Sequence, residues 1–241
     1  MLNKFAKAFI PKSILQYLKD LRSMSVRIAE LERRTQNRRH LAIDELADYL
    51  VSAQIPGDYF EFGVYKGWTF SYAYKVLSTL FKDMEFYAFD SFEGLPKPRG
   101  IDTVNGYSSN FHEHEFSCTK EEFIANLKCN NVDIEKLHII KGWFEDTLNP
   151  EKAKIYNISK IAAVWIDVDL YESTIPVLNF ITPYLSVGSI IIFDDWRCFR
   201  NLPDFGEQRA CREWLNKNPQ ITLHELFSFG WFGIAFTVGS C

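Results

Sequence analysis

The segments WIDVDLYEST (residues 165–174) and IIIFDDW (residues 190–196) decide the fold of this chain. Each begins as a run of β-branched and aromatic residues and then reaches acidic residues abruptly. A strand that is buried on both faces has a continuous apolar sequence, which is typical of the strands of a parallel sheet. In open α/β sheets, ligands bind beyond the carboxyl ends of the strands. We therefore expect the four aspartates of these two segments to lie together at one edge of one sheet.

These aspartates are Asp167, Asp169, Asp194 and Asp195, and their arrangement predicts a cation site. Carboxylates that are crowded at one edge repel one another unless a cation neutralises them. Hard divalent ions such as Mg2+ take oxygen ligands of this kind. For either motif alone the alternative is structural, with the D-x-D capping a helix and the D-D pair capping a loop. Because the two motifs follow adjacent predicted strands, we favour the cation site.

The composition indicates one sizeable α/β domain with a short accessory segment. The chain has 241 residues, of which 47% are hydrophobic and 16% aromatic, which is ample for a full core. The formal net charge of −4 gives no support for nucleic acid as the main partner. The five cysteines show no C-x-x-C spacing, which suits free thiols in a reducing compartment.

We expect a cytoplasmic protein without integral membrane contact. No apolar run reaches the roughly 18–20 residues that a membrane-spanning helix needs. Residues 1–12 are mildly basic and apolar, but they lack the hydrophobic segment and the small-residue cleavage site of a signal peptide. Peripheral membrane contact through this tip is the alternative.

Residues 13–38 have the pattern of a helix with an apolar stripe of about three heptads. Such a helix can pack on its own domain, pair with another subunit or contact a membrane. The apolar residues repeat every seven positions in two series, Ile14, Leu21 and Ile28, and Tyr17, Met24 and Leu31. The arginines toward the end of this helix are expected to form a solvated face or to meet an anionic group of a substrate. They are Arg33, Arg34, Arg38 and Arg39.

From residue 41 onward, the chain alternates strands and helices in five βα units and closes with a β-hairpin. The predicted strands are residues 59–62, 85–89, 137–141, 161–166 and 188–193, followed by the closing strands 221–226 and 232–238. The predicted helices are residues 41–53, a helix ending at 81, residues 119–129 with a capping box at their start, a helix beginning near 173, and residues 206–217. Pro176 is expected in the first turn of its helix.

A glycine turn follows the first of these strands. Gly63 and Gly67 are four residues apart, so the segment is not a G-x-G-x-x-G fingerprint and is weak by itself. A glycine in this place lets the backbone approach a ligand closely, and the next helix presents free N–H groups at its N-terminus. Asp90 ends the second strand, where an acid in nucleotide-binding folds grips ribose hydroxyls. The alternative for Asp90 is that it caps the turn that follows.

Residues 97–118 form a long polar segment without periodicity, which is typical of a lid. His112 and His114 inside it are candidates for zinc binding, for substrate contact or proton transfer, or for a merely solvated loop. Elsewhere, His138 alternates within a strand and is expected to pack rather than to bind a ligand. Trp143 and Phe144 are expected to cover a flat ring or to fill the core.

Five motifs in this order resemble the macrocin O-methyltransferase family of class I S-adenosylmethionine-dependent methyltransferases, over roughly residues 40–238. They are PGDYFEFGVYKG (56–67), FDSFEGLP (89–96), GWFEDTL (142–148), DVDLYEST (167–174) and DDW (194–196). The resemblance implies a Rossmann-like α/β fold with a mostly parallel seven-stranded sheet, helices on both faces and a C-terminal β-hairpin. Residues 40–241 would form the methyltransferase domain, and residues 1–39 an N-terminal helical segment for packing or oligomerisation.

The resemblance also implies which residues form the site. Mg2+ would bind Asp167, Asp194 and Asp195. Apart from the resemblance, Asp169 is a catalytic candidate because it lies two residues after Asp167 and could take the proton, and His112 and His114 in the predicted lid are the other catalytic candidates. S-adenosylmethionine would lie across the carboxyl edge of the sheet. The residues expected to bind it are Glu61, Gly63, Tyr65, Lys66, Thr69, Asp90, Ser91, Phe92, Gly142, Trp143, Phe144 and Asp167.

The expected reaction is transfer of a methyl group to a hydroxyl of a sugar or glycosylated small molecule, as in natural product biosynthesis. A sugar hydroxyl is a poor nucleophile, and a divalent ion would lower its pKa and orient it. A phenolic or catechol acceptor and a non-catalytic cofactor-binding module are the alternatives. A nicotinamide-dependent oxidoreductase is less compatible, because its glycine fingerprint is missing.

Overall fold

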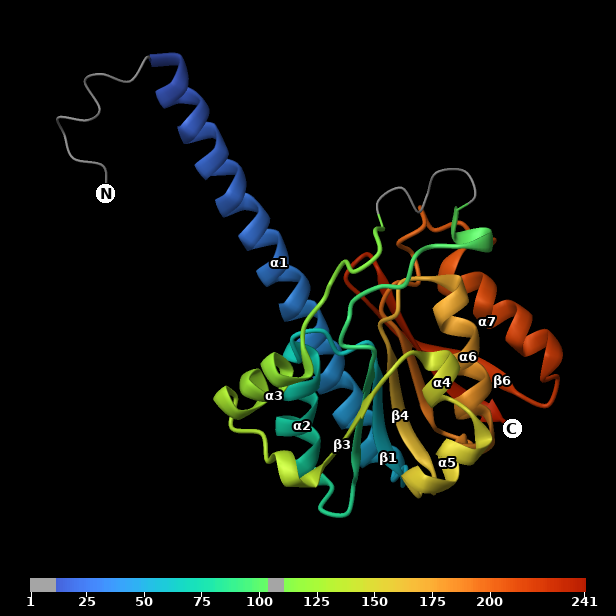
Figure 1. The fold of residues 1–241 in the computed structure, drawn as a ribbon. Helices are drawn as coiled ribbons and strands as arrows, with labels where there is room; N and C mark the ends of the chain where they lie inside the picture. The colour runs from blue at the N-terminus through green and yellow to red at the C-terminus, as the bar shows by residue number, and fades with distance from the viewer. Residues whose placement is uncertain (1–11, 104–110) are drawn as a thin grey trace. The chain divides into compact units, whose positions relative to one another are not determined.

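The structure is a computed structural model that describes residues 12–103 and 111–241 (Figure 1). The chain divides into two compact units, residues 1–38 and residues 39–241. Helix α1 (Lys12–Ala53) runs through the division. The sequence predicted two helices here, 13–38 and 41–53, and this was wrong. No glycine or proline stands between residues 38 and 41 to interrupt the backbone hydrogen bonds, so the helix continues.

Within the described residues, seven strands form one sheet in the order β3-β2-β1-β4-β5-β7-β6. Strands β1 to β5 are parallel, and β7 runs antiparallel between β5 and β6. The strands are β1 (Asp58–Phe62), β2 (Phe86–Asp90), β3 (Leu137–Lys141), β4 (Ile161–Ile166), β5 (Ile190–Phe193), β6 (Thr222–Phe229) and β7 (Gly233–Ser240). The expected mostly parallel sheet with a C-terminal hairpin is confirmed. The two closing strands are longer than expected, because β6 and β7 pair with each other from Thr222↔Ser240 to Phe229↔Gly233.

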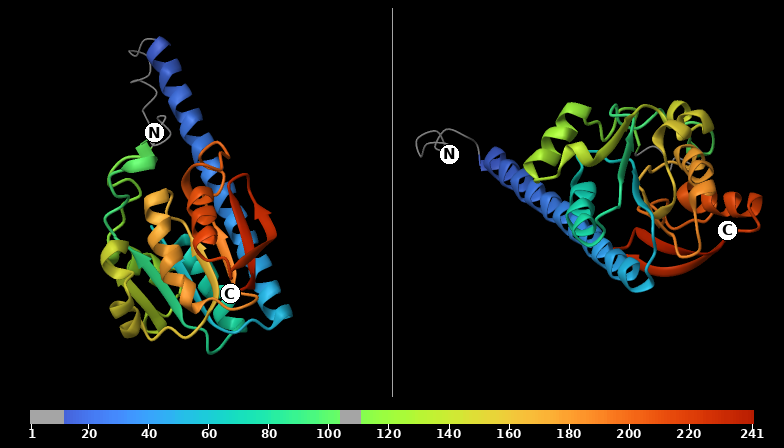
Figure 2. Two further views of the ribbon diagram at one scale, coloured as in Figure 1. Left: turned by 90° about the vertical axis from the view of Figure 1, so that its right-hand side faces the viewer. Right: turned by 90° about the horizontal axis from the view of Figure 1, so that it is seen from below.

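Helices cover both faces of this sheet, as the views in Figure 2 show. The other α-helices of the described residues are α2 (Trp68–Leu80), α3 (Lys120–Cys129), α4 (Phe144–Thr147), α5 (Pro150–Tyr156), α6 (Tyr171–Ile181) and α7 (Gly206–Lys217). Short 3-10 turns include Ile134–Lys136 and Thr182–Tyr184. One core packs α2, α3 and residues 42–50 of α1 against the sheet. The second core packs α5, α6 and α7 against the opposite face. This is the Rossmann-like layering that the sequence predicted.

The central strands are apolar throughout because both of their faces are covered. Every residue of β4 and of β5 is buried, and Trp165 on β4 lies inside the first core. On the other face, the rings of Phe60 and Tyr87 stack at 4.5 Å between centroids. Each large apolar side chain buried in this way contributes about 1.5–3 kcal/mol. The sheet is therefore a rigid platform for the loops that follow its strands.

Helices α3 and α6 begin for different reasons, because one start depends on neighbouring residues and the other on a residue far away in the sequence. Helix α3 begins with the predicted capping box, in which Thr119 and Glu122 exchange hydrogen bonds. Helix α6 begins at Tyr171, two residues earlier than expected. Its first N–H groups, those of Tyr171 and Glu172, donate to the buried carboxylate of Asp102 at 3.0 and 3.1 Å. Pro176 consequently lies inside the helix and not in its first turn, which corrects the expectation.

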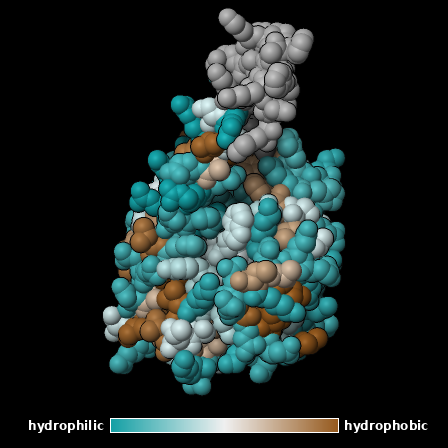
Figure 3. Space-filling view, turned by 90° about the vertical axis from the view of Figure 1, so that its left-hand side faces the viewer, coloured by the Kyte–Doolittle hydropathy of each residue, from teal (hydrophilic) through white to brown (hydrophobic). Residues whose placement is uncertain are grey.

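The outer surface carries both hydrophilic and hydrophobic side chains. On the face that carries α2 and α3, hydrophilic side chains predominate and hydrophobic ones form separate small patches (Figure 3). Trp68 and Leu80 of α2 are among the exposed large apolar residues. Of the residues that the structure describes, none belongs to a helix that is both long and apolar enough to cross a bilayer.

Candidate functional site

The acidic residues at the ends of two central strands lie together. Asp167 follows β4 and the pair Asp194-Asp195 follows β5, and these strands are paired in parallel with Ile166 opposite Phe193. One carboxylate oxygen of each of the three aspartates lies within 4.8 Å of the others. The convergence expected for four aspartates is therefore present in the structure for these three. We call these three residues the aspartate cluster.

The aspartate cluster is largely removed from water. Asp194 and Asp195 are buried, whereas Asp167 and the neighbouring Asp169 are half-buried. Burial raises the pKa of Asp195 to about 6, with Asp194 adding to the effect. Burial and the nearby Asp194 raise the pKa of Asp167 well above its usual range, although Arg39 opposes this. Ionised carboxylates held this close favour a cation between them.

Arg39 supplies positive charge to the aspartate cluster. Its Nε donates to Asp194 Oδ1 at 2.9 Å and to Oδ2 at 3.1 Å, and its Nη2 also bonds Oδ2. The same Nη2 lies 3.5 Å from Asp167 Oδ2. The sequence placed Arg39 in a solvated face or against an anionic substrate group, and its ion pair with Asp194 corrects this. The arginine and the aspartate are 155 positions apart, so no local pattern could have connected them.

Glu207 is a residue next to the aspartate cluster that sequence analysis missed. It lies in the first turn of α7, is fully buried, and accepts a hydrogen bond from the Asp195 N–H at 2.9 Å through Oε2. Its Oε1 and the Oδ2 of Asp195 are buried and have no hydrogen-bond partner among the described residues. Cys198 donates from Sγ to Asp195 Oδ1 at 3.0 Å. An acid in a first helical turn is usually read as a surface residue, so its burial carried no sequence signal.

The aspartate cluster fits a hard divalent cation. It offers three carboxylates close together, and Asp195 Oδ2 is a buried acceptor that lacks a donor within the described part of the chain. Buried polar atoms without a partner are rare in folded proteins and often mark a bound ion or water. Asp167, Asp194 and Asp195 are therefore the residues that could hold Mg2+.

Asp169 lies beside the aspartate cluster. Its backbone is in the left-handed region, with φ of 57°, on the turn between β4 and α6. Burial, followed by the charges of Asp195 and Asp194, raises its pKa well above the ordinary value. A carboxylate with a raised pKa is a stronger base, which is the property that proton abstraction from a hydroxyl needs.

The glycine turn after β1 touches the end of β4. Gly63 has φ of 79°, and a Cβ at this position would collide with the carbonyl oxygen of Asp167. Gly67 has φ of 77° and precedes the first residue of α2. Tyr65 between them also has a positive φ, of 43°. The turn thus brings the β1 loop directly against the residue that carries the first cluster carboxylate.

Asp90, the last residue of β2, binds the same turn through hydrogen bonds. Its Oδ2 accepts the N–H groups of Val64 at 2.8 Å and Tyr65 at 3.1 Å, and its Oδ1 accepts that of Phe92 at 2.7 Å. The capping alternative for Asp90 is therefore observed in the structure. Each carboxylate oxygen has more than one lone pair, so contact with ribose hydroxyls stays a prediction.

Glu61 is buried on β1, with 1% of its surface exposed. The Tyr59 hydroxyl donates to Glu61 Oε2 at 2.7 Å. Burial raises the pKa of Glu61 to about 8, against the opposing effects of Tyr59 and Arg39. Its predicted contact with the methionine part of the cofactor stays a prediction.

The structure also places four other residues that the sequence predicted to bind the cofactor. Lys66 places its ammonium 5.0 Å from the Tyr65 ring centre, and Thr69 is buried. Ser91 donates to the Gly94 carbonyl at 3.0 Å. Phe92 packs in the core, and its N–H donates to Asp90 Oδ1.

The turn after β3 lies next to Asp90, because the N–H of Gly142 donates to the Asp90 carbonyl at 2.9 Å. Phe144 packs edge-on against Phe62, with 5.9 Å between ring centroids, so it fills the core. Trp143 is half-buried and precedes α4.

The two lid histidines are exposed. His114 places Nδ1 3.0 Å from the Glu93 carbonyl, and the N–H of His112 donates to Glu115 Oε2. Residues 104–110 of the predicted lid lie outside the described residues. Within the described part of the chain, neither histidine belongs to a group of three metal-ligating side chains, so the zinc alternative gains no support. His138 stacks on Tyr87 at 4.3 Å between ring centroids, as expected for a packing residue, although it is exposed.

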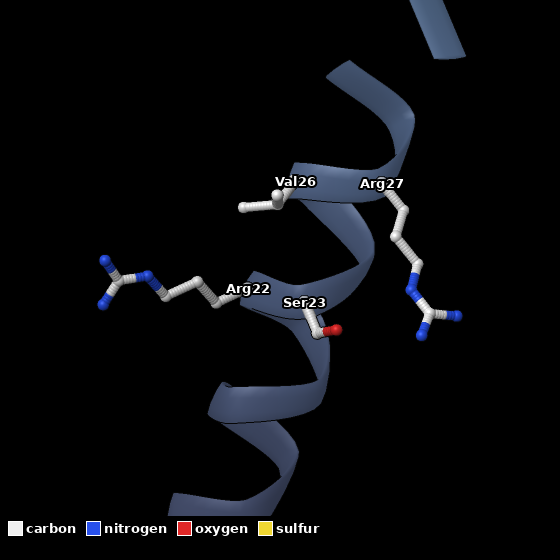
Figure 4. A pocket seen from close by; sticks show the side chains of 4 residues that line it. All are labelled: Arg22, Ser23, Val26 and Arg27. Atoms are coloured by element: carbon white, nitrogen blue, oxygen red, sulfur yellow. The ribbon is translucent and has the colours of Figure 1, made fainter. Parts of the chain in front are cut away.

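A shallow hollow elsewhere, lined by Arg22, Ser23, Val26 and Arg27, belongs to α1 alone (Figure 4). Its side chains come from one stretch of helix, and Arg22 and Arg27 extend to opposite sides of it. It shares no residue with the predicted cofactor or metal sites.

The strand order, with an antiparallel β7 between β5 and β6 and helices on both faces, gives the chain the Rossmann-like fold of the class I methyltransferases. The chain belongs to the macrocin O-methyltransferase family, whose model matches residues 32–222. The predicted resemblance is confirmed.

Curated relatives and solved structures agree with this assignment. The chain is 30% identical over 145 residues, 59% of its length, to 8-demethyl-8-(2,3-dimethoxy-alpha-L-rhamnosyl)-tetracenomycin-C 4'-O-methyltransferase of Streptomyces olivaceus, covering 54% of that protein. It is 27% identical over 169 residues, 68% of its length, to mycinamicin III 3''-O-methyltransferase of Micromonospora griseorubida, covering 63% of that protein. The chain thus spans less than two thirds of the length of these relatives.

The structure of the O-methyltransferase NovP is similar, with a TM-score of 0.69, 26% identity, and coverage of 84% of this chain and 80% of that one. The calicheamicin methyltransferase CalS11 has the same fold, with a TM-score of 0.66, 23% identity, and coverage of 82% and 77%.

Proposed function

We propose that this protein is an S-adenosylmethionine-dependent, Mg2+-dependent O-methyltransferase that methylates a hydroxyl of a sugar or glycosylated small molecule. One observation carries the proposal. The aspartate cluster lies at the carboxyl edge of a methyltransferase sheet, in contact through Asp167 with the glycine turn of Gly63. A metal site and a cofactor site that share this edge would bring an acceptor hydroxyl and a methyl donor together.

The family relatives support the acceptor class. One is named for the 4'-position of a rhamnosyl group on tetracenomycin C, and another for the 3''-position of mycinamicin III. A hydroxyl on a sugar attached to a natural product is therefore the acceptor that we propose here. A phenolic or catechol acceptor is an outcome that the experiment below distinguishes.

The proposed mechanism gives each group at the edge one task. Asp167, Asp194 and Asp195 would hold Mg2+, which when bound supplies the positive charge that lowers the pKa of the acceptor hydroxyl. Asp169 would accept the hydroxyl proton, which its raised pKa favours. The hydroxyl oxygen then displaces the sulfonium sulfur at the methyl carbon, giving a methyl ether and S-adenosylhomocysteine.

The turns around Asp90 would hold the donor for this displacement. We propose that Glu61, Gly63 and Tyr65 bind its methionine part and that Asp90 binds its ribose. The loop after β3, with Gly142 and Trp143, would lie near its adenine. Holding oxygen, carbon and sulfur in line is the largest contribution that a protein can make to such a transfer. Hydrogen bonds to Asp90 from the N–H groups of Val64, Tyr65 and Gly142 fix the loops after β1, β2 and β3 relative to each other and so support this task.

The test is methyl transfer from labelled S-adenosylmethionine to a panel of rhamnosylated natural products and, separately, to catechols, with Mg2+ or with a chelator. We expect the label on a sugar hydroxyl and loss of transfer with the chelator. Label on catechols alone would reverse the acceptor assignment, and full activity with the chelator would refute the metal role. Calorimetry that detected no binding of S-adenosylmethionine or S-adenosylhomocysteine would refute the proposed function as a whole.

A further inference from the structure

The guanidinium of Arg39 contacts two members of the aspartate cluster. It engages both carboxylate oxygens of Asp194 and lies 3.5 Å from Asp167 Oδ2. The Arg39 side chain is only 19% exposed, and that of Asp194 is 1% exposed. The ring of Phe232 lies 5.7 Å from the guanidinium carbon and covers it further. This is a buried, bidentate ion pair and not an incidental surface contact.

We propose that Arg39 and the divalent cation compete for the aspartate cluster, so that the cation binds Asp194 and Asp167 only when the guanidinium leaves them. Arg39 would then act as an internal counter-ion that sets how tightly the cluster binds metal. The inference rests on the proposed function in one respect, since it takes the cluster to be the metal site.

The positions of the oxygens support competition over simultaneous binding. Magnesium holds its oxygen ligands at about 2.0–2.1 Å, which places neighbouring ligand oxygens about 3 Å apart. The cluster oxygens lie within 4.8 Å of one another, so a single ion can reach all three residues. Arg39 Nη2 contacts both Asp194 Oδ2 and Asp167 Oδ2. It therefore uses the lone pairs of these oxygens that point into the space between the two carboxylates. A metal shared by the two residues needs the same lone pairs.

The charges support the same conclusion. A guanidinium and a divalent cation on one buried carboxylate would repel each other strongly, because there is little water to screen them. The competition concerns Asp194 and Asp167 and not Asp195, whose buried Oδ2 has no partner among the described residues to displace. Asp195 can therefore receive the cation first, and release of Arg39 completes the site.

The direct experiment measures metal binding without any acceptor. Mn2+ binding by electron paramagnetic resonance and Mg2+ binding by calorimetry are compared in the wild type, Arg39→Met and Arg39→Lys. Methionine keeps an unbranched chain and removes the charge, whereas lysine keeps the charge without the two-pronged geometry. We expect Arg39→Met to bind either metal on the order of tenfold more tightly than the wild type, with Arg39→Lys in between.

The matched control is Arg212→Met on α7, which makes the same chemical change at an exposed ion pair with Asp204, just before that helix. It should leave metal affinity at the wild-type value. Equal or weaker metal binding by Arg39→Met would overturn the inference, since Arg39 would then organise the site and not compete for it. If no variant and no wild-type protein binds a divalent ion, while S-adenosylhomocysteine still binds, the metal role itself fails together with this inference. Tighter metal binding by Arg39→Met, together with no methyl transfer by the wild type to any acceptor of the panel, would keep the inference and refute the proposed function.

A measurement on the unsubstituted protein keeps the inference testable if the variants do not fold. The arginine Nε–H signals are followed by nuclear magnetic resonance in isotope-labelled wild-type protein during a Mg2+ titration. The Arg39 signal should shift in step with the calorimetric binding curve as its bond to Asp194 is lost. A signal that stays unchanged when the metal site is saturated would overturn the inference.

Discussion

The α-carbon of Gly63 lies so close to the backbone of Asp167 that a side chain at Gly63 would strike the Asp167 carbonyl oxygen. The contact joins the loop after β1 to the loop after β4. Two parts of the proposed site, one for the methyl donor and one for the metal, are therefore held by one close backbone approach. A change at Gly63 should disturb both.

Substitution of Gly63 by alanine is expected to destabilise the protein by a few kcal/mol, on the order of 2–4, and to weaken binding of S-adenosylmethionine. The reason is twofold, because φ of 79° is strained for alanine and the clash is with backbone that cannot rotate away. Denaturant unfolding and calorimetry measure the two effects. Gly239→Ala is the control, since its φ is not in the left-handed region and the atoms that a Cβ would meet belong to side chains of β6. If Gly63→Ala were as stable as the wild type, the loops after β1 and β4 would be able to move apart, and the prediction would be wrong.

Asp194→Asn is expected to abolish Mg2+-dependent activity and also to lower stability. The substitution removes a proposed metal ligand and leaves the largely buried Arg39 without its main counter-charge. Breaking such a buried pair from one side costs on the order of 3 kcal/mol. Thermal or denaturant unfolding without added metal measures this part. The control Asp204→Asn removes the exposed partner of Arg212 and should change stability by well under about 1 kcal/mol. Equal effects at the two sites would contradict the ion pair described here.

Asp169→Asn is expected to reduce kcat by about 10²–10⁴ while leaving Mg2+ affinity nearly unchanged. A base must be deprotonated to act, and the pKa of Asp169 is raised by burial and by Asp195. The rate of the wild-type enzyme should therefore increase as pH rises through that raised pKa, and Asp169→Asn should lose this limb of the profile. In Asp167→Asn, by comparison, metal affinity and rate should fall together. A parallel loss of both in Asp169→Asn would mean that Asp169 is a metal ligand and not a base.

The buried Glu61 should make stability depend on pH. Burial raises the pKa of Glu61 to about 8 in the folded protein, from an ordinary value near 4.5 when unfolded. The folded state then binds more protons than the unfolded state between these values, so the free energy of unfolding falls as pH rises through this window. The effect amounts to up to a few kcal/mol.

Glu61→Gln tests this, because glutamine keeps an acceptor for the Tyr59 hydroxyl and cannot ionise. Denaturant unfolding at pH 6 and pH 9 should show a smaller loss of stability in Glu61→Gln than in the wild type. Identical losses in the two proteins would place the titration elsewhere.

The N-terminal helix is predicted to pair with a second copy of the chain. Its stripe residues Met24, Ile28 and Leu31 are 54%, 50% and 61% exposed, and they follow the heptad spacing. Leu31→Glu should therefore convert an oligomer into a monomer in light scattering coupled to size exclusion. Val26→Glu is the matched control, since Val26 is 63% exposed but lies off the stripe. A monomeric wild-type protein at micromolar concentration would contradict the prediction.

The sequence predicted the strands well because their signal is local. A run such as residues 161–166 is apolar throughout, and that is how a strand covered on both faces must look. The acids that follow β4 and β5 were placed correctly at one edge because neighbouring parallel strands end on the same side. The capping box at Thr119 was equally local, with both partners three residues apart.

The tertiary structure alone decided which groups surround these acids. Arg39 reaches Asp194 across 155 positions, Asp102 caps α6 from 69 positions away, and Glu207 is buried by the packing of α7. A local sequence pattern indicates which residues of one segment face water and which face the core. It does not indicate which distant side chain will neutralise a buried charge. The sequence thus determined the sheet and its acidic edge, and only the packed chain decided the counter-charges, because charge pairing depends on distances in space and not on spacing along the chain.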